Sequence, residues 1–338
     1  MIAKPRKKLT LKDVANVLSI APSTVSKALR DSSDISEEMK EKVKYKAEEL
    51  GYRPNLLARS LINNKSRILG ILIPDLRISF FSEAVRGMYE EANKKGYQTI
   101  LLVHDENKDI ERDKLEFLSD IHADGILLNA VDQKSNFDLY NQLAEEGTKI
   151  VCWDRRLEGL GFHSVTIDDK KASFELTSKM IKQGRRHILF FGPNTRIPVV
   201  KDRLEGYKLA LKKNGIAFNP KLVVHTFFRD YSKSYRKMLS IINSKIKIDG
   251  VISIGGIIAY GAAKAILASN LKIPKDIMLG EFGDNDVVAR LGVPFYAVYQ
   301  NPYMIGKSSV DLLIKLIEHK GMHDNFNDII IEFKILKR

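Results

Sequence analysis

Polar side chains that can donate hydrogen bonds gather on one side of a short helix predicted at residues 22–29. Apolar residues recur at helical spacing on its other side, which indicates that this side is buried. The outward-facing residues are Ser23, Thr24, Ser26 and Lys27. Hydroxyl and ammonium groups on an exposed helix can hydrogen-bond base edges and phosphates in the DNA major groove. The pattern therefore predicts recognition of DNA rather than a chemical reaction.

Two neighbouring helices are expected to position this one. Thr10 can cap a first helix, with Asp13 at its third position, and residues 19–20 break that helix. Pro22 fits the first turn of the next helix, where its missing N–H is not needed. Ser36 can cap a third helix. Two helices joined by a tight turn and followed by a third are typical of DNA-binding headpieces.

Charge supports this interpretation. Residues 1–66 contain 14 Lys and Arg against 8 Asp and Glu, and the first twelve residues hold five basic side chains. Such an arm indicates a contact to phosphates, although alone it could equally be a solvated tail. The whole chain has a net charge of +13, and residues 67–338 retain +7 of it. The positive charge is therefore not confined to the start of the chain.

Length and composition limit the remaining possibilities. With 338 residues, the chain fits a headpiece followed by a large bilobed domain. No apolar run approaches the roughly 18 residues that a membrane span requires, and the N-terminus lacks the apolar stretch of a signal peptide. The single cysteine, Cys152, permits no internal disulfide and suits a reducing compartment. We therefore expect a cytoplasmic protein.

After residue 64 the pattern changes to alternating strands and helices. Strands are predicted at 68–73, 99–104, 125–128, 149–153, 187–191, 222–225, 250–254 and 277–279. Helices are predicted at 82–95, 108–121, 137–146, 170–183, 203–214, 232–243 and 259–269. Such alternation predicts parallel sheets covered by helices, and two series in tandem predict two lobes. Ligands of such folds usually bind at the carboxyl ends of the strands.

The sequence shows no catalytic or metal-binding constellation. It lacks a Walker-A loop and a G-x-G-x-x-G after a strand, and its seven histidines have no metal-ligand spacing. Gly255 and Gly256 precede a helix, but such a pair more often serves close packing than phosphate binding. Cys152 lies in an apolar strand, where an inert thiol is the default. We therefore expect a protein that is not an enzyme and uses neither cofactor nor metal.

The segment LTLKDVANVLSIAPSTVSKAL at residues 9–29 resembles the headpiece of the lactose repressor/galactose repressor (LacI/GalR) family. The segment EELGYRPNLLARSL at residues 48–61 resembles that family's hinge. Three positions depart from the family pattern. Ser19 replaces a common Gly, which is acceptable if its backbone need not be left-handed. Lys27 replaces Arg, which weakens a bidentate guanine contact, and Arg30 replaces Asn.

The resemblance implies an α/β fold with an all-α helix-turn-helix headpiece and a two-lobed domain of doubly wound parallel sheets, similar to periplasmic sugar-binding proteins. The expected headpiece is residues 1–52, the hinge and linker 53–66, and the effector-binding and dimerisation domain 67–338. The first lobe would comprise about 67–165 and 297–325. The second would comprise about 166–296 and a C-terminal strand. The chain would cross between lobes near 165, near 295 and near its end.

The resemblance also implies the residues that contact DNA. They are Thr10, Pro22, Ser23, Thr24, Ser26, Lys27, Arg30, Asn55, Ala58, Arg59 and Leu61. In this view residues 55–62 form a hinge helix only on DNA, and Leu61 wedges into the minor groove and kinks it. The alternative is that the leucines of this segment pack a linker helix onto the core.

The expected effector site is carried over from matching motifs. Its residues are Phe80, Phe81, Asp154, Arg203, Gly255 and Asp284. The phenylalanines could instead be plain core, Asp154 a helix cap or ion-pair partner, and Arg203 part of a structural ion pair. Gly255-Gly256 replaces a common Asn-Asp, and Glu281-Phe282-Gly283-Asp284 replaces G-F-D-D. Because these changes remove groups that usually hold sugar hydroxyls, we expect an unusual effector, such as a sugar acid, a sugar phosphate or a protein.

Together these observations predict a homodimeric transcriptional regulator that binds a pseudopalindromic operator in double-stranded DNA. We expect a repressor controlled by a sugar or sugar derivative in the cleft. A corepressor-dependent or activating regulator that responds to a protein or non-sugar effector stays open. A sugar-binding protein without a DNA role is a weaker alternative, since the chain shows no signal peptide. A dimer is preferred over a tetramer, because residues 329–335 resemble a strand and not a leucine-heptad tail.

Overall fold

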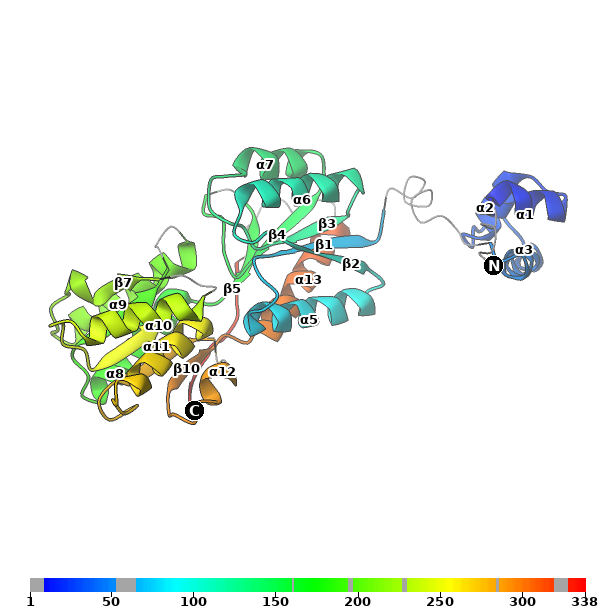
Figure 1. The fold of residues 1–338 in the computed structure, drawn as a ribbon. Helices are drawn as coiled ribbons and strands as arrows, with labels where there is room; N and C mark the ends of the chain where they lie inside the picture. The colour runs from blue at the N-terminus through cyan, green and yellow to red at the C-terminus, as the bar shows by residue number, and fades with distance from the viewer. Residues whose placement is uncertain are drawn as a thin grey trace. The chain divides into compact units, whose positions relative to one another are not determined.

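A computed structural model describes residues 9–52, 65–159, 161–193, 197–226, 230–283, 286–318 and 328–338. The chain divides into two compact units, Met1–Ser66 and Arg67–Arg338, each of which is considered by itself (Figure 1).

The described part of the first unit contains three helices, α1 (Leu11–Leu18), α2 (Pro22–Ala28) and α3 (Glu37–Glu49). The Thr10 N–H donates to Asp13 Oδ2 over 2.7 Å, and the Ser36 hydroxyl accepts from the Met39 N–H, so the predicted caps of α1 and α3 are present. The buried residues of the three helices meet in one small core: Val14, Ala15, Val25, Ala28, Val43 and Ala47. Apolar burial thus fixes which face of α2 remains outside.

The turn between α1 and α2 departs from the expectation for Ser19. Its backbone lies in the left-handed region, with φ 53° and ψ 40°, where it caps the C-terminus of α1. A residue with a Cβ pays roughly 1–2 kcal/mol for this conformation, which glycine adopts freely. The turn therefore has the left-handed conformation that favours glycine. The replacement of glycine by Ser19 was expected to be acceptable only without this conformation, so that expectation is wrong.

The second unit contains two six-stranded sheets. The first has the order β11-β5-β4-β3-β1-β2, and all its pairings are parallel. Its strands are β1 (Ile68–Ile73), β2 (Gln98–Val103), β3 (Gly125–Leu128), β4 (Lys149–Trp153), β5 (His163–Thr166) and β11 (Asp328–Ile330). Its helices are α5 (Ser79–Lys94), α6 (Lys108–Asp120), α7 (Phe137–Glu145) and α13 (Pro302–Glu318). Sheet and helices form the first lobe.

The second sheet has the order β12-β10-β9-β8-β6-β7, and only the β10–β12 pairing is antiparallel. Its strands are β6 (Ile188–Gly192), β7 (Val223–His225), β8 (Gly250–Ser253), β9 (Met278–Phe282), β10 (Tyr296–Tyr299) and β12 (Lys334–Lys337). The helices of this second lobe are α8 (Asp169–Lys182), α9 (Pro198–Lys213), η1 (Pro220–Leu222), α10 (Tyr231–Ile242), α11 (Gly256–Ala268) and α12 (Asp286–Ala289).

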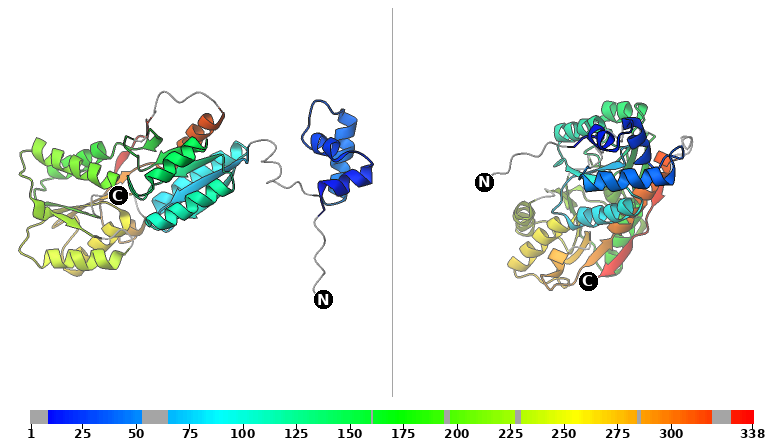
Figure 2. Two further views of the ribbon diagram at one scale, coloured as in Figure 1. Left: turned by 90° about the horizontal axis from the view of Figure 1, so that it is seen from above. Right: turned by 90° about the vertical axis from the view of Figure 1, so that its right-hand side faces the viewer.

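Helices cover both faces of each sheet (Figure 1 and Figure 2). In the first lobe, α5 and α13 pack on one face and α6 and α7 on the other. In the second lobe, α8 and α9 cover one face and α10 and α11 the opposite one. The strands are therefore buried on both sides, which explains their nearly continuous apolar sequences.

The chain passes between the lobes three times, and two passages differ from the expected ones. β10 pairs with β9 and β12, so residues 297–299 belong to the second lobe and not to the first. The apolar run at 329–335 was expected to be a single strand. It divides into β11, which pairs with β5 of the first sheet, and β12, which pairs with β10 of the second.

Candidate functional site

The outer face of α2 presents the polar groups that the sequence predicts there. Ser23 and Lys27 are exposed, whereas Thr24 and Ser26 are half-buried. Pro22 occupies the first helical position and is exposed. Val25 and Ala28 hold the opposite face in the core. The helix is therefore fixed to the headpiece along one side and offers hydroxyl and ammonium donors on the other.

Lys27 is paired within the headpiece. Its ammonium group donates to the carboxylate of Asp34 in the segment after α2, and both side chains remain about half exposed. This hydrogen bond lowers the pKa of Asp34 to about 2, so the carboxylate stays charged at neutral pH. Arg30 turns its Nε back to the Ser26 carbonyl at 3.0 Å. A DNA group that accepts a hydrogen bond from Lys27 must therefore displace the Asp34 carboxylate from its ammonium group.

The remaining predicted DNA contacts lie elsewhere. Thr10 is exposed at the N-terminal cap of α1. The hinge residues Asn55, Ala58, Arg59 and Leu61 lie outside the described residues.

A pocket opens between the two lobes at the carboxyl ends of their strands. It encloses about 740 Å³, including space open to solvent, and receives residues from the loops after β1, β2, β4, β8, β9 and β10 and from the starts of α5, α9 and α11. Five of the six predicted effector residues line it: Phe80, Phe81, Asp154, Arg203 and Gly255. The sixth, Asp284, lies outside the described residues.

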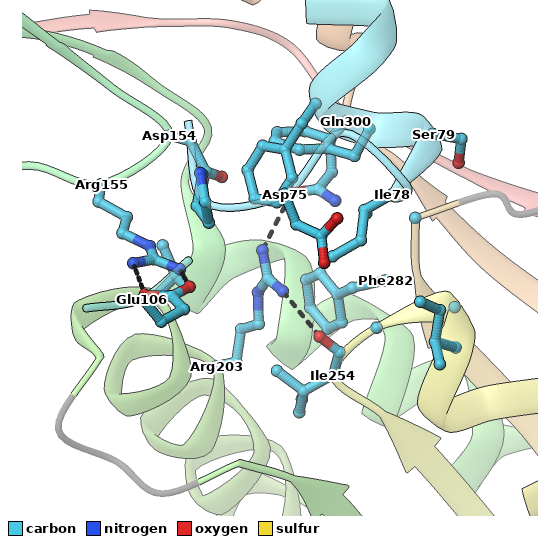
Figure 3. Close-up of a pocket in the computed structure, with 18 residues that line it drawn as sticks. Asp75, Ile78, Ser79, Glu106, Asp154, Arg155, Arg203, Ile254, Phe282 and Gln300 are labelled. Carbon is cyan, nitrogen blue, oxygen red and sulfur yellow. Dashed lines mark hydrogen bonds and ion pairs between the residues drawn. The ribbon is translucent and has the colours of Figure 1, made fainter. Parts of the chain in front are cut away.

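Arg203 stands at the centre of the pocket and is held from several sides (Figure 3). Its Nε donates to Asp169 Oδ1 at 2.6 Å, its Nη2 donates to Gln300 Oε1 at 3.0 Å, and its guanidinium stacks 4.0 Å from the Phe282 ring centroid. The Ser173 hydroxyl donates to the Arg203 carbonyl at 2.6 Å. Arg203 thus forms the structural ion pair that was the alternative to a ligand contact, and the same residue also lines the pocket.

The position of Arg203 depends on how α9 packs on α8. At Gly206, one turn further along α9, an added Cβ would lie 2.1 Å from the Lys170 carbonyl oxygen. Only glycine permits this approach of the two helices. It brings Arg203 against Asp169 in the first turn of α8, where the ion pair is buried. Burial raises the pKa of Asp169 to about 7, because loss of solvent outweighs the attraction of Arg203 for the charged form.

A second ion pair closes the side of the pocket that faces β2 and β4. Arg155 is buried, and its Nη1 and Nη2 donate to Glu106 Oε2 and Oε1 at 2.9 and 2.5 Å (Figure 3). The Arg155 Nη1 also donates to the Ala130 carbonyl at 3.0 Å. Glu106 has a left-handed backbone, φ 54°, directly after Asp105 at φ 56°. This two-residue bend in the loop after β2 aims the carboxylate at Arg155.

Asp154 is placed differently from the other acids of the pocket. Its Oδ2 accepts from the Asn129 side-chain amide at 3.1 Å, while the neighbouring Arg155 pairs with Glu106 and Arg156 with Asp202. Burial raises the pKa of Asp154, and the nearby arginines oppose that effect only in part. The carboxyl group therefore has hydrogen-bonding capacity left for a ligand.

Sequence reasoning missed several lining residues, among them Asp75, Glu106, Arg155 and Gln300. Asp75 accepts from the Arg77 guanidinium and backbone N–H, which neutralises it locally. The charges that line the pocket are thus largely compensated. Their positions in the sequence could have indicated them, because each of these four residues lies just after the end of a strand.

A helix-turn-helix unit followed by a bilobed domain with a pocket at its strand ends defines a DNA-binding regulator that responds to a ligand. Residues 10–55 match the bacterial regulatory proteins of the lacI family, and residues 69–321 match the periplasmic binding protein domain. The chain belongs to the lacI family of bacterial regulatory proteins. It is a transcriptional regulator and not an enzyme.

Relatives match along nearly the whole chain. The HTH-type transcriptional regulator RegA of Clostridium saccharobutylicum is 30% identical over 97% of this chain and 98% of its own. The ribose operon repressor of Haemophilus influenzae is 27% identical over 96% of each chain. Among solved structures, the lac repressor dimer bound to operator and an anti-inducer has a TM-score of 0.85 at 19% identity, covering 98% of each chain. The complex of the regulator CelR with cellobiose has a TM-score of 0.73 at 22% identity, covering 97% of this chain and 98% of that one. At these identities the structural matches establish the fold.

Within the described part of the chain, none of the helices has the length and apolar character needed to cross a membrane.

Proposed function

We propose that this regulator is a cytoplasmic repressor whose interlobe pocket binds a neutral, hydroxyl-rich small molecule of the sugar class. The observation that carries the proposal is the charge pairing of the pocket. Arg203 is paired with Asp169 and Arg155 with Glu106, whereas among the described residues the Asp154 carboxyl accepts a hydrogen bond from the Asn129 amide. Ligand hydroxyls can donate to such a carboxyl without bringing an uncompensated charge into the protein.

An anionic effector fits this arrangement less well. A sugar acid or sugar phosphate would have to displace Asp169 from Arg203 and leave that carboxylate buried beside Asp154. Because the pKa of Asp169 is raised to about 7, the displaced carboxyl can take up a proton, at a cost that increases as the pH rises above 7. The pairing therefore favours the neutral sugar over the anionic derivatives suggested by the retained arginine.

Phe80 and Phe81 support the same class of ligand. Phe80 and Phe81 line the pocket, and their ring centroids lie 5.3 Å apart in an edge-to-face arrangement. The Phe81 ring also packs edge to face against Trp153. Flat apolar surface beside a hydrogen-bonding carboxyl suits a molecule with hydroxyls on its edges and C–H groups on its faces. The relatives named as ribose operon repressor and the CelR complex with cellobiose are consistent with a sugar.

A thermal-shift screen of the full-length protein tests this proposal. Neutral mono- and disaccharides should raise the melting temperature more than the matching sugar acids and sugar phosphates. A ligand at about 100 times its dissociation constant adds roughly 2.7 kcal/mol of stability. Asp154→Asn should abolish the shift. A larger shift from the anionic compounds, or an unchanged response of Asp154→Asn, would show that the ligand class is wrong.

The remaining parts of the proposal concern assembly and signalling. Residues 53–66 act as a hinge between the headpiece and residues 67–338, and two copies bind the two halves of an operator. Ligand binding changes the relative position of the lobes and thereby the hinge. Light scattering at micromolar concentration should give a dimer; a monomer or tetramer would contradict this assembly.

A further inference from the structure

An ion pair joins the two lobes beside the interlobe pocket. The Arg156 Nη2 donates to Asp202 Oδ2 over 3.1 Å. Arg156 follows β4 of the first lobe, and Asp202 lies on α9 of the second (Figure 1). Of these described residues and their neighbours, Arg155 and Arg203 line the pocket, whereas Arg156 and Asp202 do not. Below, this contact is called the interlobe ion pair.

The first lobe fixes the backbone on both sides of Arg156. The Gln133 side-chain amide donates to the Arg156 carbonyl at 2.6 Å, and its oxygen accepts from the Glu158 N–H at 2.8 Å. Between these two residues, Leu157 is buried in the core of the first lobe. On the other side, Arg155 is buried and held by its own ion pair. The Arg156 side chain therefore moves with the first lobe.

Asp202 is fixed to the second lobe in a similar way. Its neighbours on α9, Val200 and Arg203, are buried. Gly206, one turn further along, brings α9 close to the backbone of α8. Asp202 therefore moves with both helices and with the sheet that they cover. A large separation of the lobes must break the interlobe ion pair.

A second carboxylate competes for Arg156 from its own lobe. The Arg156 Nη2 lies 3.3 Å from Glu158 Oε1, so both carboxylates share the same terminal nitrogen. The side chains of Arg156 and Glu158 are 40% and 54% exposed, and that of Asp202 is 22% exposed. When the lobes separate, Arg156 keeps Glu158 as a partner. The interlobe ion pair can therefore break without leaving the charge of the arginine uncompensated.

We propose that the interlobe ion pair is a regulatory contact that holds the lobes together, and that Glu158 weakens it by sharing Arg156. The contact favours the closed arrangement of the lobes, in which the pair is formed, before any ligand binds. A ligand that prefers one arrangement then shifts an equilibrium to which the pair already contributes. This consequence for the pocket rests on the proposed function, whereas the effect on the lobes does not.

The size of the effect is that of a partly exposed ion pair. Solvent screens such charges, and pairs of this kind change an equilibrium by about two- to fivefold. A bias of this size stays within reach of a ligand, because a ligand with about a tenfold preference for the open arrangement outweighs it. The pair therefore adjusts the response of the lobes and does not lock them.

Double electron–electron resonance on the full-length protein without a ligand measures the distance between the lobes. Spin labels are attached at Lys108→Cys, at the start of α6, and at Lys237→Cys, on α10, since both positions are exposed. The native Cys152 is buried and stays unlabelled. A large excess of unlabelled protein ensures that a dimer contains only one labelled chain.

Removal of either partner should open the lobes. Asp202→Ala and Arg156→Gln should each lower the ratio of the closed to the open arrangement by about two- to fivefold. The double variant should behave like either single variant, because all three lack the same contact. Glu158→Ala should raise the ratio, since it leaves Arg156 to Asp202 alone. The matched control is Asp138→Ala, which removes the partner of Arg112 in an exposed ion pair within the first lobe and should leave the ratio unchanged.

An unchanged ratio in Asp202→Ala, an equal change in Asp138→Ala, or a lower ratio in Glu158→Ala would each overturn the proposal. Salt gives an independent check. About 0.5 M NaCl should lower the ratio in the wild type, because it screens exposed charges, and should have little effect on Asp202→Ala. Circular dichroism of each variant excludes loss of folding. Because no ligand is present, failure here leaves the sugar proposal intact, and failure of the sugar screen leaves this contact to be judged by the distances alone.

Discussion

Arg203 and Asp169 form a buried ion pair across two packed helices, with 2.6 Å between Nε and Oδ1. The arginine that family resemblance marks as a ligand donor therefore has its charge balanced before any ligand enters. Its other contacts, to Gln300 and Phe282, hold the guanidinium in one plane. The pair supports the proposal of an uncharged ligand, and it lies where α9 packs closely on α8.

The pH dependence of stability should reveal this pair. Burial raises the pKa of Asp169 from 3.8 to about 7, so between these values the folded protein holds a proton that the unfolded chain has released. The free energy of unfolding must therefore decrease as pH rises from about 4 to about 7. In Asp169→Asn this contribution is absent, and chemical denaturation should show a shallower decline over the same range. Parallel curves for the two proteins would contradict the raised pKa.

Replacement of Lys27 tests the face of α2 that contacts DNA. Lys27→Ala should weaken the binding free energy by about 1–3 kcal/mol for a DNA sequence selected by the wild-type protein. The loss for random DNA should be smaller. The matched control is Lys44→Ala, because Lys44 is about equally exposed and has a similar ion pair with Asp31 on another part of the headpiece. Fluorescence anisotropy at fixed salt measures both. Equal loss on both DNAs would reduce Lys27 to a phosphate contact.

Removal of the partner carboxylate should have the opposite effect. Asp34→Asn frees Lys27 from its hydrogen bond and removes a negative charge from the surface that meets DNA. Affinity should therefore rise, and it should rise most at low salt, where exposed charges are least screened. Salt titrations of wild type and variant provide the comparison. Weaker binding by Asp34→Asn would mean that the carboxylate orients Lys27 for DNA and does not compete with it.

Replacement of the left-handed Ser19 by glycine should increase the stability of the headpiece. Ser19→Gly should stabilise the headpiece by about 0.5–1 kcal/mol, because relief of the strained backbone exceeds the extra freedom of glycine in the unfolded chain. Amide hydrogen exchange in α1 should slow accordingly, by about two- to fivefold. Ser19→Ala keeps the Cβ and is the control without gain. An equal effect of both variants would remove the backbone explanation.

The proposed hinge can be tested through Leu61. If this side chain wedges into the minor groove, Leu61→Ala should reduce both DNA bending and operator affinity, while thermal shifts caused by pocket ligands stay unchanged. A circular-permutation gel assay reports the bend. Leu57→Ala, in the same segment, is the comparison. An unaltered bend angle in Leu61→Ala would rule out the wedge.

Elements marked by caps or by continuous apolar runs were mostly predictable from the sequence, and relationships between distant segments were not. Helices α1 to α3 and the strands β1, β3 and β4 follow from caps and apolar runs. The four-residue strands β5 and β10 were not predicted, although the equally short β3 was. Helix α13 was also missed, although its apolar positions recur at helical spacing.

The pocket shows the same division. Motif resemblance placed Asp154 and Arg203 in it. The partners Asp169 and Glu106 lie 34 and 49 positions from the arginines that they bind, in stretches that look like ordinary charged surface. Nothing local marks such partners, because their roles arise only when two loops or helices meet. For that reason the sequence suggested an unpaired arginine and an anionic ligand, and the folded chain supports the opposite.

The division of the C-terminal run into β11 and β12 also limits how the lobes can move. Strand β11, at the edge of the first sheet, ends at Ile330, and strand β12, at the edge of the second, begins at Lys334. Three residues lie between them. Four Cα steps reach roughly 13–14 Å at full extension. The two sheets are therefore tethered at one edge by a short connection that cannot exceed this length. Any large ligand-driven displacement must be a rotation that pivots near this connection, with the greatest travel at the strands farthest from it, β2 and β7.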